Sequence, residues 1–114
     1  QVDYDREMAL VATLPDEQGN ELQIGVARYV TNPDGETVEF ALAVADEWQK
    51  HGVGRKLMSM LIECARQKGY RAVVGEVLTQ NSKIFRLVTS LGFSVHTHHE
   101  DPAVKRVVLS LHPL

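Results

Sequence analysis

A glycine-rich segment between an apolar strand and a long amphipathic helix most constrains how this chain can fold. An apolar run covers residues 38–45, and Gly52-Val53-Gly54 then precedes residues 55–68, where apolar side chains recur at helical spacing. Gly69 can take the left-handed conformation that ends such a helix. Because residues 71–78 read as another strand, we predict a β-α-β crossover with parallel, right-handed connectivity.

Breaks rich in proline, asparagine and glycine divide the rest of the chain into short elements. Turn residues at 15–20 and 31–36 separate three apolar runs, which predicts an antiparallel meander before the crossover. The resulting fold class is α/β with one mixed sheet, in the order β-β-β-α-β-α-β-β. The predicted elements are strands 8–14, 22–30 and 38–45, helix 55–68, strand 71–78, helix 81–91, and strands 93–98 and 104–111.

Size, charge and cysteine content restrict the functional classes. The 114 residues suffice for one domain core, so we expect a single domain over 1–114. A formal net charge of -3 provides no basic surface for nucleic acid. The chain has no apolar run of membrane-spanning length, and its single Cys64 cannot form an internal disulfide, so we expect no signal peptide. We therefore expect a cytoplasmic protein, with Cys64 a structural thiol.

The glycine-rich segment has the properties of an anion site. The start of a helix leaves backbone N–H groups unpaired, and glycines let those groups approach a phosphate closely. Arg55 and Lys56 oppose the helix dipole by about 0.3–1 kcal/mol each, which a bound anion would offset. Lys50 and His51 would add donors on the other side of the loop. The alternative is a glycine-rich turn with solvated basic residues.

Two other phosphate-binding loops fit this segment less well. A Walker A loop needs four residues between its glycines, whereas only Val53 separates Gly52 from Gly54. A dinucleotide loop would place its third glycine where the chain has Leu57. A regulatory domain that binds NAD or ATP is therefore disfavoured.

The pattern Gln49-x-x-Gly52-x-Gly54 resembles the Q/R-x-x-G-x-G/A signature of the GNAT superfamily of N-acetyltransferases. The resemblance extends from the strand at 39–44 to Leu91-Gly92-Phe93. The opening residues 3–12 resemble the acetyltransferase domain of bacterial Pat-type protein lysine acetyltransferases, so the likeness covers nearly all of the chain. It implies the GNAT fold and acetyl transfer from acetyl-CoA to an amine without a metal.

The resemblance also implies partners. Pat-type enzymes acetylate lysines on metabolic enzymes such as acetyl-CoA synthetase, which makes a protein lysine the first expected acceptor and a small amine the alternative. Such domains are often fused to an acyl-CoA-synthetase-like or nucleotide-binding regulatory region. GNAT domains normally begin with a strand and one or two helices that precede this segment, so we expect a fragment, or a minimal form, of a larger acetyltransferase.

Residue roles follow from the same resemblance. The loop amides would bind the pyrophosphate of CoA, while Asn81 and the backbone of the third strand would contact the pantetheine arm. One strand amide would also stabilise the oxyanion of the tetrahedral intermediate. The expected cofactor-binding residues are Leu42, Ala43, Val44, Gln49, Lys50, His51, Gly52, Val53, Gly54, Arg55 and Asn81.

Glu39 is the expected general base. It lies on the strand that leads into the loop, and alternation places it on the face of Ala41 and Ala43. A lone carboxylate among small apolar residues suits proton abstraction, and Pat-type enzymes resemble this chain in having a glutamate there. Glu76 on the next strand is the rival, as base, water-orienting group or binder of the incoming lysine. Val88 stands where many GNAT enzymes place the tyrosine that protonates the thiolate, so that role is unfilled.

Two further features carry alternative functions. His96, His98 and His99 cluster near a strand end, and His96 and His98 would share one face of the strand. We expect no metal site, because no third ligand at a convincing spacing accompanies these two histidines. Trp48 is expected to pack rather than to stack on adenine. The unfilled tyrosine position leaves open a catalytically weak module that binds CoA and senses it.

Overall fold

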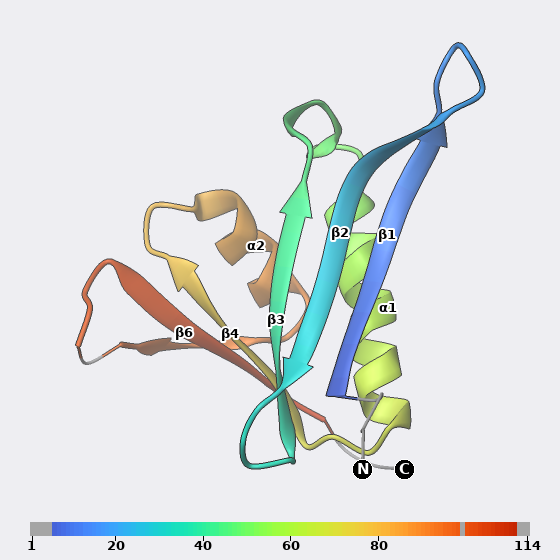
Figure 1. Ribbon diagram of the computed structural model, residues 1–114. Coiled ribbons are helices and arrows are strands. Elements are labelled where there is room, and N and C mark those ends of the chain that lie inside the picture. The colour runs from blue at the N-terminus through green and yellow to red at the C-terminus, as the bar shows by residue number, and fades with distance from the viewer. Residues whose placement is uncertain (1–5, 99, 112–114) are drawn as a thin grey trace.

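The computed structural model describes residues 6–98 and 100–111, and it contains one six-stranded mixed sheet with two α-helices (Figure 1). Every predicted helix and strand is present within two residues of its predicted bounds, which confirms the mixed α/β class. The Asp3–Asp5 part of the Pat-like opening lies outside the described residues. The elements are β1 (Glu7–Pro15), β2 (Glu21–Thr31), β3 (Thr37–Val44), the 3₁₀ helix η2 (Asp46–Trp48), α1 (Val53–Gln67), β4 (Ala72–Leu78), α2 (Ser82–Ser90), β5 (Ser94–Thr97) and β6 (Val104–Ser110).

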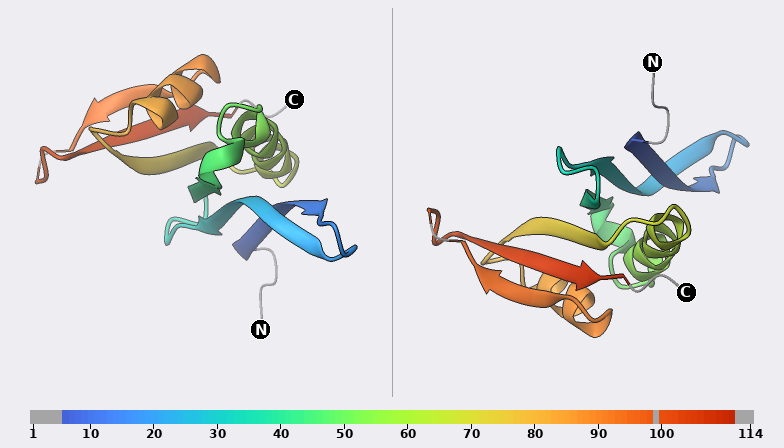
Figure 2. Two further views of the ribbon diagram at one scale, coloured as in Figure 1. Left: turned by 90° about the horizontal axis from the view of Figure 1, so that it is seen from above. Right: turned by 90° about the horizontal axis from the view of Figure 1, so that it is seen from below.

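The strand order is β1-β2-β3-β4-β6-β5, and all neighbouring pairs are antiparallel except β3 with β4. The predicted meander and the predicted parallel pair are therefore confirmed. The parallel pair is short, running only from Thr37 opposite Ala72 to Glu39 opposite Val74. Beyond that point β3 and β4 diverge, and the views along the sheet in Figure 2 show its two halves separating.

Both helices pack on the same face of the sheet. Helix α1 buries one stripe of side chains against β1 to β4, and Gly54 at its start lies close to Leu87 of α2. None of the described helices is long and apolar enough to cross a membrane. The buried stripe of α1 consists of Leu57, Met58, Leu61, Ile62 and Ala65, the five positions that the helical spacing predicts.

The opposite face of the sheet is open, since no helix among the described residues covers it. Strand alternation places Glu39, Ala41 and Ala43 on this face, as predicted, whereas Val38 and Phe40 are buried on the helix side. Register extends the open face across the neighbouring strands. The paired residues Arg28, Glu76 and Arg106 therefore lie on the same side of the sheet as Glu39.

The divergence of β3 and β4 begins at a packed aromatic pair. The rings of Phe40 and Phe93 meet edge to face, with their centroids 5.6 Å apart. Gly75 of β4 lies directly under the Phe40 ring, where a Cβ would overlap ring carbons. A glycine is therefore required at position 75 because the ring occupies the space of a side chain.

Replacing Gly75 with Ala should lower the free energy of unfolding by about 1–3 kcal/mol, because overpacking forces the Phe40 ring or the strand to move. Urea unfolding would measure the loss. The double variant Gly75→Ala/Phe40→Leu should recover part of it, since the smaller side chain frees the space. If the effects of the two substitutions on the free energy of unfolding were simply additive, the contact with the Phe40 ring would not be the cause of the destabilisation.

The turn between β2 and β3 is fixed by the side chain of Asp34. Its Oδ1 accepts the backbone N–H groups of Glu36 at 2.8 Å and Thr37 at 2.9 Å, and its Oδ2 accepts the Thr37 hydroxyl at 2.9 Å. These hydrogen bonds favour the ionised form, so they lower the pKa of Asp34 below its usual 3.8, the backbone bond from Glu36 contributing most.

A lowered pKa in the folded state means that ionised Asp34 stabilises the fold above its unfolded-state pKa, and that this stabilisation is lost as the pH falls through the lowered value. Asp34→Ala should therefore melt at a lower temperature than the parent at pH 7. The difference should shrink as the pH drops below about 3.8. Thermal melts of the parent and of Asp34→Ala between about pH 2.5 and pH 7 would test this. A difference in melting temperature that stayed constant over this range would contradict it.

Candidate functional site

Beyond Glu39 and Val74 the strands β3 and β4 no longer pair, and we call this unpaired region the opening. Backbone groups of β3 line it. The Ala45 N–H donates to the Ile24 carbonyl of β2 at 2.8 Å, so strand alternation turns the backbone of Ala43 toward β2 as well. The backbone groups of Leu42 and Val44 then point toward β4, which no longer pairs with β3 at this level. Of the three strand residues predicted to bind pantetheine, Leu42 and Val44 present backbone groups to the opening, whereas Ala43 belongs to the β2–β3 ladder.

The predicted anion loop lies at the end of β3 and leads into α1. Gly52 has a φ of 78° and occupies the N-cap position, with no side chain capping the helix. The first helical bond is donated by Lys56 N–H to Gly52 O at 3.0 Å. The amides of Val53, Gly54 and Arg55 thus precede the helical ladder, and the first turn of α1 contains no acidic residue. This arrangement can accept an anion.

Gln49 holds the loop in place. Its Nε2 donates to the Val44 carbonyl and to Asp46 Oδ1, both at 3.1 Å. Its Oε1 accepts the ammonium of Lys83 from α2, also at 3.1 Å. Gln49 therefore joins the end of β3, the loop and α2, and its side chain is structural in this arrangement.

The basic residues of the loop have different surroundings. Arg55 donates to Ser90 Oγ at 2.6 Å, so its guanidinium faces the end of α2. Lys50, His51 and Lys56 are exposed, and the His51 ring lies 5.0 Å from the Trp48 ring. The predicted packing role of Trp48 agrees with this contact. The structure thus places the positive charges of two lysines, and the ring of His51 as a further donor, at the loop.

The second helix forms the other side of the opening. Asn81 is the N-cap of α2, where its Oδ1 accepts the Ile84 N–H at 3.2 Å. Its Nδ2 remains as a donor beside the end of β4. Val88 is fully buried in the core, so its position offers neither a hydroxyl nor access to the opening.

Two carboxylates lie on the open face beside the opening, one on each strand. Glu39 is half-buried at the last residue pair of β3 with β4, opposite Val74, and no hydrogen bond or ion pair joins its carboxylate to another described residue. Its neighbours Ala41 and Ala43 are exposed, so the apolar surroundings expected for Glu39 are open to solvent. Glu76 lies two residues beyond Val74, and its Oε2 is 2.9 Å from His98 Nε2.

The histidines do not form a metal centre among residues 6–98 and 100–111, where no group of three potential ligands converges. His96 Nε2 instead lies 2.8 Å from Ser94 Oγ. His99 lies outside the described residues. Side-chain periodicity could not predict the contact between His98 and Glu76, because α2 separates the two residues in the sequence.

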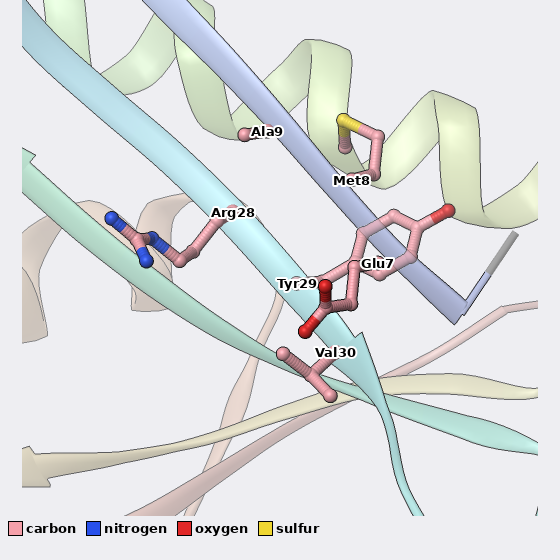
Figure 3. A pocket seen from close by; sticks show the side chains of 6 residues that line it. All are labelled: Glu7, Met8, Ala9, Arg28, Tyr29 and Val30. Atoms are coloured by element: carbon pink, nitrogen blue, oxygen red, sulfur yellow. The ribbon is translucent and has the colours of Figure 1, made fainter. Parts of the chain in front are cut away.

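A separate hollow lies on β1 and β2, away from the loop (Figure 3). Its side chains belong to both faces of the two strands, since Met8 and Tyr29 lie on the helix side and Arg28 and Val30 on the open side. It is therefore a depression across the sheet and not a walled cavity.

The profile of the family described as "Acetyltransferase (GNAT) family" matches residues 2–93 of this chain. The acetyltransferase PA5475 of Pseudomonas aeruginosa is 34% identical over 92 residues, which span 81% of this chain and 49% of that protein. The L-methionine sulfoximine/L-methionine sulfone acetyltransferase of Salmonella typhimurium is 41% identical over 69 residues, 60% of this chain and 40% of that protein. The chain thus spans about half or less of the length of these relatives.

Solved structures agree with the same fold. The GNAT domain of S. lividans PAT superposes with a TM-score of 0.80 at 25% identity, over 97% of this chain and 64% of that one. The Salmonella typhimurium acetyltransferase yncA, solved with its cofactor acetyl-CoA, has a TM-score of 0.70 at 31% identity, over 80% of this chain and 60% of that one.

Replacing Gln49 with Met should remove all three bonds of its side chain while keeping its length. Because these bonds are exposed, we expect a loss of about 1 kcal/mol in the free energy of unfolding. Urea denaturation would measure it against Gln80→Met, a matched exposed position without such bonds. Equal stability of the two variants would show that Gln49 does not hold the loop.

Proposed function

This chain belongs to the GNAT acetyltransferase family, and on that premise we propose that it transfers an acetyl group from acetyl-CoA to an amine. The observation that carries the proposal is a pair of backbone surfaces around one opening: the amides that begin α1, which precede the helical ladder, and the groups of Leu42 and Val44 on the β4 side, which have no ladder partner although Gln49 bonds the Val44 carbonyl. The first can accept a pyrophosphate, and the second can pair with an extended amide chain. CoA combines these two chemical features in one molecule.

In this proposal the loop amides of Val53, Gly54 and Arg55 bind the pyrophosphate of acetyl-CoA, with Lys50 and His51 as further donors. Leu42 and Val44 pair with the pantetheine arm from one side of the opening, and the free Nδ2 of Asn81 donates from the other. The narrow fit at Gly54, where a Cβ would meet Leu87 at 3.4 Å, supports a close approach of the helix start to α2. Because β3 leads from Glu39 to the loop, a pantetheine arm that runs from the loop along β3 would point its thioester toward Glu39.

The proposed chemistry is direct transfer assisted by Glu39. A lysine amine with a pKa near 10.4 is almost wholly protonated at pH 7, so the acceptor must lose a proton before it attacks. Glu39, through a water molecule, takes that proton, and the nitrogen then attacks the thioester carbonyl. A strand amide stabilises the oxyanion of the tetrahedral intermediate, and the nitrogen loses its second proton to water as the C–S bond breaks and the CoA thiolate leaves. Because Val88 cannot donate a proton, water protonates the thiolate or it leaves as the anion.

Two acceptor classes each have a specific observation in their favour. The coverage and TM-score of the PAT domain favour a protein lysine, the acceptor expected from the sequence. The 41% identity to a methionine sulfoximine and methionine sulfone acetyltransferase favours the α-amine of a small amino acid derivative. A cytoplasmic location is part of the proposal, since the single Cys64 needs no oxidising compartment.

Release of free CoA thiol from acetyl-CoA would test the activity and separate the acceptors. The assay would compare an acetyl-CoA synthetase as protein acceptor with L-methionine sulfone, spermidine and Nα-acetyl-lysine methyl amide. Release with the protein alone supports the lysine acceptor, and release with L-methionine sulfone alone supports the amino acid derivative. Binding of acetyl-CoA without release for any acceptor would favour the sensing module instead.

Glu39→Gln should reduce kcat at least about 100-fold while the affinity for acetyl-CoA changes less than about twofold, because general-base catalysis contributes about 10²–10⁴-fold and the carboxylate does not contact the loop. Calorimetric titration and steady-state kinetics would measure the two quantities. Glu21→Gln, an exposed strand glutamate far from the opening, is the matched control. An equal loss of affinity and turnover in Glu39→Gln would refute the role of base.

A further inference from the structure

We propose that Glu76 and His98 form the subsite that binds the acceptor as its ammonium ion, with His98 acting as a positioning residue for the Glu76 carboxylate. The inference rests on the proposed function and deepens it by assigning a second carboxylate to substrate binding. Its starting point is the 2.9 Å contact between Glu76 Oε2 and His98 Nε2, which joins β4 to the connection between β5 and β6.

The hydrogen bonds of His98 determine which of its ring nitrogens carries the proton. Its Nδ1 accepts the backbone N–H groups of Glu100 at 3.3 Å and Asp101 at 3.2 Å. A neutral ring whose Nδ1 is an acceptor carries its proton on Nε2. His98 therefore donates from Nε2 to Glu76, and the neutral ring suffices to orient the carboxylate.

The geometry leaves one oxygen of Glu76 for a ligand. His98 engages Oε2, and no described residue bonds Oε1, although Arg106 lies opposite Glu76 in the β4–β6 register. The side chain of Glu76 is 42% exposed, so its carboxylate is accessible from solvent on the open face. A hydrogen-bonded carboxylate of this kind is ready to accept a cation.

Glu76 and Glu39 lie on the same face of the sheet and on opposite sides of the opening. Glu39 pairs with Val74, and Glu76 is the next residue of β4 on that face. An ammonium bound at Glu76 would therefore be held beside the group that removes its proton. In this arrangement Glu76 binds the ammonium and Glu39 takes its proton. The subsite favours acceptors that arrive as primary ammonium ions.

Steady-state kinetics with the acceptor that the protein acetylates would test the positioning role. His98→Phe should raise the KM for the acceptor about fivefold to tenfold and leave the KM for acetyl-CoA unchanged, because it removes the donor to Glu76 and the acceptor for the Glu100 and Asp101 amides but no contact of the loop. His98→Gln, which keeps a donor near the Nε2 position, should restore most of the loss. His96→Phe, on the same face but bonded to Ser94, should match the parent.

A binding measurement separates this inference from the proposed activity. Nα-acetyl-lysine methyl amide, titrated into the protein with CoA present, should shift the backbone NMR signals around Glu76, and its uncharged norleucine analogue should not. Glu76→Gln should weaken this binding at least about fivefold. Unchanged binding in Glu76→Gln, or equal binding of the norleucine analogue, would overturn the subsite even if acetyl transfer occurs. Ammonium binding at Glu76 without any turnover would support the subsite while refuting the proposed activity.

Discussion

The rest of the site depends on the point where β3 and β4 stop pairing. Up to Glu39 and Val74 the two strands share one parallel ladder, and beyond them the Phe40 ring fills the space above Gly75. The strand backbone on the β4 side of Leu42 and Val44 is left without a ladder partner as a result. A sheet that continued to pair here would satisfy these groups internally and leave nothing for a ligand to bind. The packing of one aromatic ring thus belongs to the architecture of the site.

The second contribution to the site comes from the start of α1, where the partial charge of the backbone amides and the charge of the side chains are both positive. The first amides of the helix carry the positive end of its dipole, and Lys56 adds a formal charge while no acidic residue compensates it. Such an arrangement costs free energy in the empty protein and gains it when an anion binds. The proposed binding of a phosphate group at the loop therefore rests on this charge arrangement as well as on the family.

Periodicity predicted the elements and the buried stripe of α1, because both depend on side-chain spacing along one segment. It also placed Glu39 on the open face with Ala41. It could not assign the backbone of Ala43 to β2, since that requires the register of the β2–β3 ladder, and it could not show that Ala41 and Ala43 are exposed. The contact of Glu76 with His98 lies between distant segments, and only the folded arrangement of β4, β6 and β5 brings them together.

Two hydrogen bonds attach the loop region to α2, and in both of them the partner in α2 is synthesised well after the loop. Gln49 meets Lys83 across 34 positions of sequence, and Arg55 meets Ser90 across 35. When the ribosome has just added the glycine loop to the chain, it has therefore not yet added the residues that fix the loop. At about 5–20 residues per second, those residues follow a few seconds later. The nascent chain passes through an interval in which α1 can form while its N-terminal end still lacks these contacts with α2.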